Sequence, residues 1–407
     1  MILPHNWIVA SWSDIVVITH GQNQKEIESL DGIYPIYGSG GQIGRGTKYL
    51  CKAGSIVVGR KGTIDRPFFT QTNFWNIDTA FGITSTEGVL PRYLFAFCQY
   101  FDFKTLDHST GRPSLTQTNL YGIKIPLPPL AEQHRIVAKI DALFSRLDKG
   151  VETLQTIQHQ LRTYRQAVLK WAFEGKDWEM KPFKEIATSR LGKMLDKKKN
   201  IGDLRQYLRN INVRWFCFDC SDLLKMQIEE QEIEKYQIKN GDLLICEGGE
   251  PGRCAIWRQN KTIAFQKALH RVRVNLDMSS DFLMYYISCL AATGKLKEYF
   301  TGTGIMHLTG ESLNKIKVPK PPLNEQTSIV ASIESRLSVC DKLEAIVEEN
   351  LNKAQALKQS ILKKAFAGQL VPQDPNDESA EKLLECIKAE KHPEPVISKT
   401  ARKSKRG

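Results

Sequence analysis

The chain has 407 residues, enough for two or three domains of ~100–200 residues each. Its 57 Lys and Arg residues against 45 Asp and Glu residues give a formal net charge of +12, which favours a polyanionic partner. The 41% of hydrophobic residues excludes a disordered or collagen-like chain. Because no apolar run approaches the ~18–20 residues of a membrane span and the first residues lack a signal-peptide pattern, we expect a cytoplasmic protein.

The nine cysteines are scattered, and only Cys217 and Cys220 form a C-x-x-C pair. A zinc site needs a second pair of ligands at similar spacing, so we expect reduced, mostly buried thiols and no metal site. The glycine-rich segment 38–44 lacks the lysine of a phosphate-binding loop, and neither G-x-S-x-G nor H-E-x-x-H occurs. The sequence therefore predicts no catalytic residue and no cofactor site on this chain.

An internal repeat with an offset of 193 residues organises the sequence. Residues 125–140 return without a gap as residues 318–333, and both copies contain P-x-P-P-L-x-E-Q-x-x-I-V-A-x-I. The same register continues to Gly175, which corresponds to Gly368. A period of this length indicates two copies of one large module rather than a solenoid.

Each copy begins with a divergent region, residues 1–125 and residues 176–318. Their openings still correspond, with Trp7 in one and Trp178 in the other. Both regions are rich in glycine, aromatic and β-branched residues arranged in short alternating runs, a composition typical of strands joined by turns. We interpret both as mixed α/β globules dominated by strands.

The shared blocks, residues 126–175 and 319–368, predict one long helix each. After a Pro-Pro pair, about 45 residues run without another proline, which gives a helix of about 65–70 Å. Glu132 and Glu325 fall in the first turn, where a carboxylate complements the helix dipole. Gly175 and Gly368 follow the helices as C-terminal caps.

Apolar residues in both helices recur at alternating steps of four and three residues, which is a heptad seam. We expect the helices to pack on each other as an antiparallel coiled coil. Further apolar positions widen the stripe: Ile157, Tyr164, Ile346 and Leu357. Polar residues interrupt the seam and favour one register over others: Gln158, Arg165, Glu344 and Lys358. Beyond the second helix, residues 369–407 form a tail with a short amphipathic helix and a basic, disordered end.

The distribution of charge favours DNA as the polyanion. The second globule carries a net +6, and nine basic against three acidic residues lie between Lys184 and Arg214. A solvated surface is the alternative interpretation of this basic run. Two similar globules joined by a helical pair suit a ligand with two recognition points, and a DNA duplex is such a ligand.

Base reading uses Arg for guanine, Asn or Gln for adenine and carboxylates for cytosine, while half or more of protein–DNA hydrogen bonds go to the backbone. The candidates for DNA contact in the first globule are Ser39, Gln42, Arg60, Lys61, Arg112 and Ser114. Those in the second globule are Arg190, Lys193, Lys197, Lys198, Lys199, Arg209, Asn210, Asn212, Arg214, Glu247, Arg253, Gln266, Lys267 and His307.

The order of globule, P-x-P-P-L-x-E-Q helix, globule and repeated helix resembles the specificity subunit of type I restriction-modification enzymes. The resemblance covers nearly the whole chain. It includes residues 34–41 in the first globule, residues 207–214 and 241–257 in the second, and residues 370–378 in the tail.

This resemblance implies an α+β fold with two mixed α/β target recognition domains, separated by two long helices that form an antiparallel coiled coil with a pseudo-two-fold repeat. It implies a non-catalytic subunit whose recognition domains each read one half of a bipartite double-stranded DNA target. Two adenine-N6 methyltransferase subunits would use S-adenosylmethionine to modify a flipped adenine in each half-site. Restriction/translocase subunits, driven by ATP, would complete the enzyme.

Three alternatives differ from this interpretation. The chain could be a fused or degenerate nuclease or methyltransferase, although the missing motifs argue against an enzyme. It could be a scaffold that uses the coiled coil only to assemble partners. It could also serve a methylation-only system, because a nuclease subunit would be a separate polypeptide.

Overall fold

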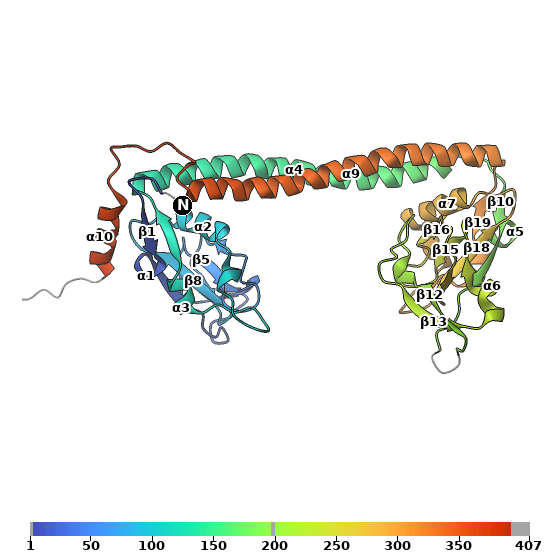
Figure 1. The fold of residues 1–407 in the computed structure, drawn as a ribbon, viewed down its shortest axis with the longest axis horizontal. Helices are drawn as coiled ribbons and strands as arrows, with labels where there is room; N and C mark the ends of the chain where they lie inside the picture. The colour runs from blue at the N-terminus through green and yellow to red at the C-terminus, as the bar shows by residue number, and fades with distance from the viewer. Residues whose placement is uncertain (1–2, 197–199, 392–407) are drawn as a thin grey trace, which may run out of the picture. The chain divides into compact units, whose positions relative to one another are not determined.

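The computed structural model describes residues 3–196 and 200–391 (Figure 1). The chain forms two compact units. Unit 1 comprises residues up to 153 together with those from 350 onward, and unit 2 comprises residues 154–349. Each unit contains one globule and a segment of both long helices, α4 (Leu130–Phe173) and α9 (Leu323–Phe366).

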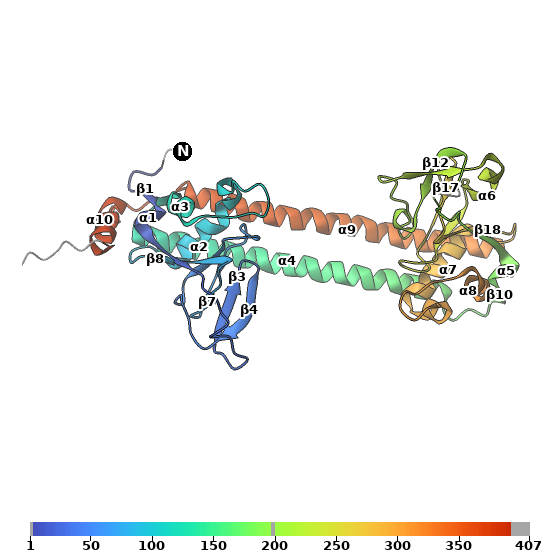
Figure 2. The ribbon, with the colours of Figure 1, turned by 90° about the horizontal axis from the view of Figure 1, so that it is seen from below.

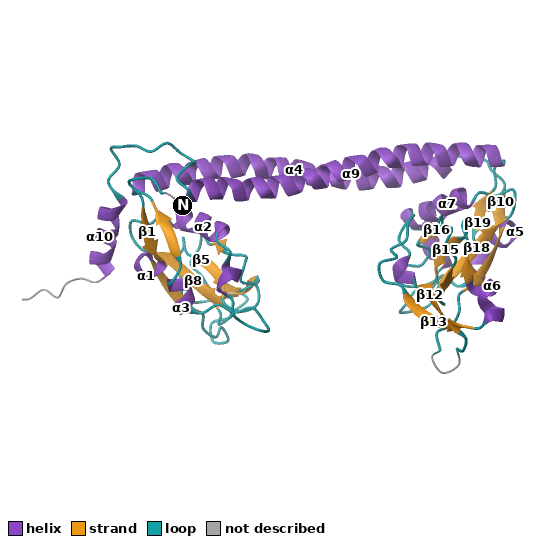
Figure 3. Ribbon diagram, in the orientation of Figure 1, coloured by secondary structure: helices purple, strands orange, loops and turns teal. Residues whose placement is uncertain are grey.

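Unit 1 contains two sheets and a strand pair (Figure 3). The first sheet has the order β2 (Val16–His20), β8 (Ala80–Ser85), β5 (Ile56–Gly59) and β6 (Phe68–Phe69). The second has the order β4 (Gly41–Gly46), β3 (Tyr34–Gly38) and β7 (Trp75–Asn76), while β1 (Ile8–Ser11) pairs with β9 (Lys124–Leu127). The helical elements are α1 (Trp12–Ile15), α2 (Pro91–Tyr100), η1 (Phe103–Leu106), α3 (Gln117–Tyr121) and α10 (Ala380–Lys391).

Unit 2 repeats this topology, with one additional strand in its second sheet. Its first sheet has the order β11 (Ala187–Leu191), β18 (Leu269–Val274), β15 (Leu243–Cys246) and β16 (Cys254–Ile256). Its second has the order β13 (Leu224–Ile228), β12 (Asp203–Leu208), β17 (Ile263–Phe265) and β14 (Gln237–Ile238), and β10 (Met180–Pro182) pairs with β19 (Lys317–Pro319). Its helical elements are α5 (Phe183–Ile186), η2 (Asn210–Asn212), η3 (Glu230–Glu232), α6 (Ile233–Tyr236), α7 (Ser280–Ala292), η4 (Lys295–Tyr299) and α8 (Gly310–Lys315).

The repeat therefore includes the globules, whose sequences diverge, as well as the shared helices. In each unit the strand that follows the short first helix pairs antiparallel with the strand of the same sheet that comes last in the chain, β2 with β8 and β11 with β18. The predicted α+β fold with two mixed α/β globules and a pseudo-two-fold repeat is confirmed.

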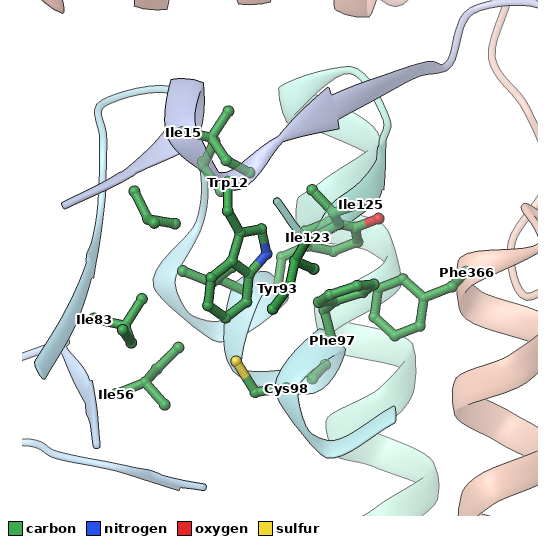
Figure 4. Packing of buried hydrophobic residues seen from close by; sticks show 14 of the residues in the cluster. Trp12, Ile15, Ile56, Ile83, Tyr93, Phe97, Cys98, Ile123, Ile125 and Phe366 are labelled. Carbon is green, nitrogen blue, oxygen red and sulfur yellow. The ribbon is translucent and has the colours of Figure 1, made fainter. Parts of the chain in front are cut away.

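The core of unit 1 lies between its first sheet and helix α2, and it continues onto the long helices (Figure 4). Trp12 is fully buried there, with ring centroids 6.4 Å from Phe97 and 6.2 Å from Phe103. Phe366 of α9 enters the same core, 5.4 Å from the Tyr93 ring and 5.3 Å from the Phe97 ring. Burial of such aromatic side chains, each worth about 1.5–3 kcal/mol, fixes the globule on the helices of its unit.

A glutamine at the start of each long helix joins that helix to its globule. Gln133 is fully buried; its Oε1 accepts from the backbone N–H of Leu90 at 2.9 Å, and its Nε2 donates to the carbonyls of Gly88 and Pro128 at 3.2 Å. The side-chain amide thereby satisfies three backbone groups on two segments. This contact explains the glutamine of the repeated P-x-P-P-L-x-E-Q pattern.

Gln326 makes the same contact in unit 2. Its Oε1 accepts from Ser279 N–H at 2.8 Å, and its Nε2 donates to the carbonyls of Asp277 at 3.1 Å and Pro321 at 2.9 Å. We refer to these two arrangements, centred on Gln133 and Gln326, as the glutamine clamps.

The glutamates of the pattern hold a second segment, the opening of each globule. The indole N–H of Trp7 donates to Glu132 at 2.9 Å, and that of Trp178 donates to Glu325 at 3.1 Å. The sequence predicted only a favourable interaction with the helix dipole, so the side-chain partner is new. Burial raises the pKa of Glu132, although the hydrogen bonds from Trp7 and from Gln373 oppose that rise.

Within each unit the segments of α4 and α9 lie side by side and run in opposite directions (Figures 1 and 2). The predicted seam residues of both helices are buried or half-buried. Arg165, one of the polar interruptions, donates to the two carboxylate oxygens of Glu344, another interruption, at 3.0 and 2.9 Å. These two polar seam positions therefore pair between α4 and α9 in unit 2 and specify a register.

The predicted widening of the apolar stripe is wrong at three positions. Tyr164, Ile346 and Leu357 are 44%, 52% and 49% exposed, because a seam of two helices buries only a narrow strip of each one. Both predicted caps adopt the left-handed conformation, with φ of +69° at Gly175 and +70° at Gly368.

The C-terminal helix packs on unit 1. Arg135 of α4 pairs with both carboxylate oxygens of Asp377, at 3.2 and 2.6 Å, just before α10 begins. Residues 399–406, predicted to be a basic disordered end, lie outside the described residues. Six of the nine cysteines are buried, whereas Cys217 and Cys386 are exposed and Cys220 is half-buried.

Replacing Gln326 by Ala leaves the Ser279 amide and two carbonyls without their partner in a buried position. We expect the free energy of unfolding to fall by about 1–3 kcal/mol. Gln359→Ala is the matched control, because the Gln359 amide is exposed and makes only a 3.4 Å contact with the carbonyl of Gln99. Urea unfolding followed by circular dichroism measures both variants, and equal losses would contradict the role of the clamp.

Candidate nucleic-acid interface

In unit 1 most of the candidate residues gather around the loop that follows β5. The backbone N–H groups of Arg60 and Lys61 donate to the carbonyl of Thr79, at 2.8 and 3.2 Å. On the other side, Gly62 N–H donates to the carbonyl of Pro113 at 2.8 Å. The loop is thereby held between the turn before β8 and the segment before α3.

Three further candidates lie around this loop, and a fourth, Gln42, lies apart from it. Ser114 forms an isolated antiparallel bridge with Lys61. Arg112 lies over Gly62 so closely that a Cβ there would be 2.9 Å from its Nη2, and Gly62 has a φ of +89°. The amide of Ser39, in the β3–β4 turn, is 3.4 Å from the Thr79 hydroxyl, whereas the exposed amide of Gln42 donates to Gly44. Apart from Gln42, the structure connects these candidates directly or through Thr79.

Sequence reasoning missed two residues at this site. His20, at the end of β2, has a ring nitrogen 2.8 Å from Oε1 of Gln117, at the start of α3. Its ring also lies edge-on to Phe81, with centroids 5.1 Å apart, and Arg60 lies over the same phenyl ring. Because His20 and Gln117 are 97 residues apart in the chain, no local pattern connects them.

In unit 2 several of the candidates surround the loop from Glu247 to Arg253, which joins β15 to β16. Asn210 donates from its side chain to the carbonyl of Gly248 at 3.3 Å, and Arg253 donates to the backbone carbonyl of Asn210 at 2.8 Å. His307 reaches the loop from the segment before α8, since a Cβ on Gly248 would lie 3.1 Å from its Nδ1. These contacts join three segments that are far apart in sequence.

The turn between β17 and β18 lies beside this loop. The N–H of Glu247 donates to the carbonyl of Ala268 at 2.9 Å. Ala268 has a φ of +84°, which is strained for a residue other than glycine and places the turn among sites that hold backbone strain. Two candidates, the half-buried Gln266 and the exposed Lys267, occupy the same turn.

Two candidates in unit 2 are built into its scaffold. Lys193 is 7% exposed, forms an ion pair with Glu232 and lies over the Tyr236 ring at 5.5 Å. Asn212 is 1% exposed; its Oδ1 accepts from the N–H of Arg209, and its Nδ2 donates to two backbone carbonyls. Both side chains stabilise the unit, and their assignment as DNA contacts stays a prediction.

The basic run from Lys184 to Arg214 is largely neutralised where the structure describes it. Arg209 pairs with Asp222 at 2.6 Å and Arg214 with Asp219 at 3.7 Å. The exposed Arg190 lies opposite Arg271 in the strand register. The candidates Lys197, Lys198 and Lys199 lie outside the described residues.

No group of three or more His, Cys, Asp or Glu side chains suited to a metal ion occurs in residues 3–196 and 200–391. Within those same residues, no helix has both the length and the apolar character that crossing a bilayer requires.

One buried histidine supports the interface of unit 2. His270 is 1% exposed, and its Nε2 lies 3.0 Å from the carbonyl of Leu308, next to His307. Burial lowers the pKa of His270 below its ordinary value of 6.5, while the contact with Leu308 and the charge of Glu247 oppose the shift. The ring is therefore neutral in the folded unit at pH 7.

Unit 2 should lose stability as the pH falls below 6.5, because the unfolded chain takes up a proton that the folded unit excludes. His270→Gln should reduce this dependence between pH 7 and pH 5. His159→Gln is the control, since His159 is exposed on α4 in the same unit. Melting temperatures measured across this range test the expectation, and an unchanged pH slope in His270→Gln would contradict it.

Comparison with known proteins identifies the class to which this fold and these loop clusters belong. The family model for the type I restriction modification DNA specificity domain matches residues 4–159 and 175–353, one match for each repeat. The chain therefore belongs to the family of type I restriction-modification specificity proteins.

Individual relatives agree with this assignment. The specificity subunit of the type I restriction enzyme EcoKI from Escherichia coli (strain K12) is 30% identical over 297 residues, which cover 66% of this chain and 64% of the relative. The chain thus matches slightly less than two thirds of that relative's length. The EcoDI specificity subunit from Escherichia coli is 23% identical over 442 residues, with 96% of both chains covered.

Two solved structures share the fold. A chain from a study of complex assembly and conformational transition of the type I R-M system has a TM-score of 0.74 and 19% identity, with 91% of this chain and 100% of that chain covered. The HsdS subunit from Thermoanaerobacter tengcongensis has a TM-score of 0.52 and 19% identity, with 90% and 98% covered.

Proposed function

We propose that this chain is the DNA sequence-recognition subunit of a type I restriction-modification complex. Each globule reads one half of a bipartite target, and the chain directs adenine-N6 methylation and restriction by partner subunits. The observation that carries the proposal is the repeated loop cluster. Each unit presents polar and charged side chains on the loop after the same central strand, in a chain that belongs to the specificity family.

The proposed partners are double-stranded DNA, two adenine methyltransferase subunits and restriction/translocase subunits. The chain itself would be non-catalytic, with S-adenosylmethionine and ATP bound by the partner subunits. The lack of enzyme motifs in the sequence supports this division of labour. A methylation-only system would use the same chain in the same way, because the nuclease belongs to another polypeptide.

An exposed apolar stripe on α9 supports assembly with a protein partner. In unit 2, Val339, Leu343 and Ile346 are 55%, 42% and 52% exposed and occur at steps of four and three residues, the spacing of one helix face. At the repeat offset of 193 residues, the positions matching the first two are Arg146 and Gly150, which lack such a stripe. The two repeats would therefore bind a methyltransferase subunit with different affinities.

Leu343→Glu should weaken association with the methyltransferase subunit by about 1.5–3 kcal/mol, because it places a charge in a contact that would bury a leucine. Ser338→Glu adds the same charge at an exposed position on a different face of α9 and serves as the control. Titration calorimetry of the purified subunits measures the affinity. Equal affinities for the two variants would exclude this stripe as the contact.

Methylation sequencing of single DNA molecules tests the proposed function directly. Cells that express this chain together with the methyltransferase encoded beside it are compared with cells that express the methyltransferase alone. We expect N6-methyladenine only with the chain, at a two-part motif with a fixed gap. Methylation that is absent, or identical without the chain, would remove the recognition role and favour the scaffold interpretation.

A further inference from the structure

Two residues of opposite charge follow the same strand in the two repeats. Arg60 comes directly after β5, and Glu247 comes directly after β15. Both strands are completely buried and occupy the third place in sheets of the same order, β2-β8-β5-β6 and β11-β18-β15-β16. The two residues therefore occupy equivalent positions at the ends of corresponding strands in the two units.

Backbone hydrogen bonds fix the equivalence at the level of single residues. The N–H of Arg60 donates to the carbonyl of Thr79 at 2.8 Å, and the N–H of Glu247 donates to that of Ala268 at 2.9 Å. Leu115 N–H donates to the carbonyl of Arg60 at 2.8 Å, and Leu308 N–H donates to that of Glu247 at 2.7 Å. The two leucines are 193 residues apart, which is the repeat offset.

The guanidinium of Arg60 is positioned but not saturated. It lies over the Phe81 ring, 5.9 Å from the centroid, and Nη1 donates to the carbonyl of Asp78 at 3.2 Å. The side chain is half-buried, and this is its single hydrogen bond to the described residues. Four of the five N–H donors of the guanidinium are thus available to a ligand, including the pair needed for bidentate contact.

The carboxylate of Glu247 also has unused capacity. It has no hydrogen-bond or ion-pair partner within the described parts of the chain. Arg253, the basic residue of the same loop, pairs with Glu250 at 2.9 Å. A carboxylate is repelled by phosphate, so a DNA contact made by Glu247 must go to a donor on a base edge. The amino group of cytosine is the donor that Glu typically accepts from in the major groove.

We propose that Arg60 and Glu247 are equivalent base-reading residues, and that Arg60 recognises a guanine in one half-site while Glu247 recognises a cytosine in the other. This assignment rests on the proposed function. One backbone position, carrying opposite charges in the two repeats, thereby makes the two half-sites of the target unlike. The pair differs from the other candidates because its two members occupy equivalent backbone positions in the two repeats and carry opposite charges there.

Methylation sequencing of cells that express the chain and its methyltransferase tests this pair. Arg60→Gln should relax one G·C pair in one half-site, and Glu247→Gln should relax one C·G pair in the other. Discrimination at that base pair should fall about 5- to 150-fold, with every other position unchanged. The charge-matched controls, Lys139→Gln on α4 in unit 1 and Glu298→Gln in unit 2, are exposed residues outside these loops and should leave the motif intact.

The outcomes separate this assignment from the proposed function. No bipartite methylation with the unsubstituted chain overturns both. A bipartite motif that Arg60→Gln or Glu247→Gln leaves unchanged, or weakens at all sites equally, overturns the assignment alone. If Arg60→Gln abolishes methylation, Arg60→Lys decides: relaxation at one guanine supports base reading, whereas an unchanged motif or complete loss contradicts it.

Discussion

The fold of each unit depends on the contact between the start of a long helix and the globule that precedes it. The Gln133 and Gln326 side chains satisfy one donor and two acceptors of the backbone in fully buried positions. A buried backbone group without a partner costs about 1–3 kcal/mol, so these side chains cannot be replaced by apolar residues without a loss. The neighbouring glutamates add the Trp7 and Trp178 contacts. The P-x-P-P-L-x-E-Q pattern thereby joins each long helix to two segments of its globule, one through the glutamine and one through the glutamate.

Because these contacts fix each globule to its helices, the loop sequences of the two globules can differ without loss of the fold. Their first sheets keep the same strand order, while the loops after β5 and β15 differ in length, charge and glycine content. The backbone groups at the start of each loop remain bonded in the same way on both sides, as at Arg60 and Glu247. Such an arrangement suits a recognition protein, because the side chains can change without disturbing the scaffold that presents them.

The charges of unit 2 show why a count of basic residues is a poor guide to a binding surface. Between Lys184 and Arg214, Lys193, Arg209 and Arg214 each have a carboxylate partner. Their charges stabilise the unit, whereas Arg190 is exposed and free of any ion pair within the described residues. Binding of a polyanion therefore depends on which charges remain available and on their placement.

The sequence by itself determined the two-fold repeat, the two long helices, their seam and their glycine caps, because these follow from local rules: a period of 3.5 residues, proline at the start and glycine at the end. It also indicated which loops carry the polar residues. Only the tertiary structure decided that His20 meets Gln117, that Lys193 and Asn212 are internal, and that Arg60 and Glu247 are equivalent. Each of these findings depends on strand pairing or burial between segments that are far apart in the chain. Strand pairing and burial of this kind leave no periodic signal in the sequence.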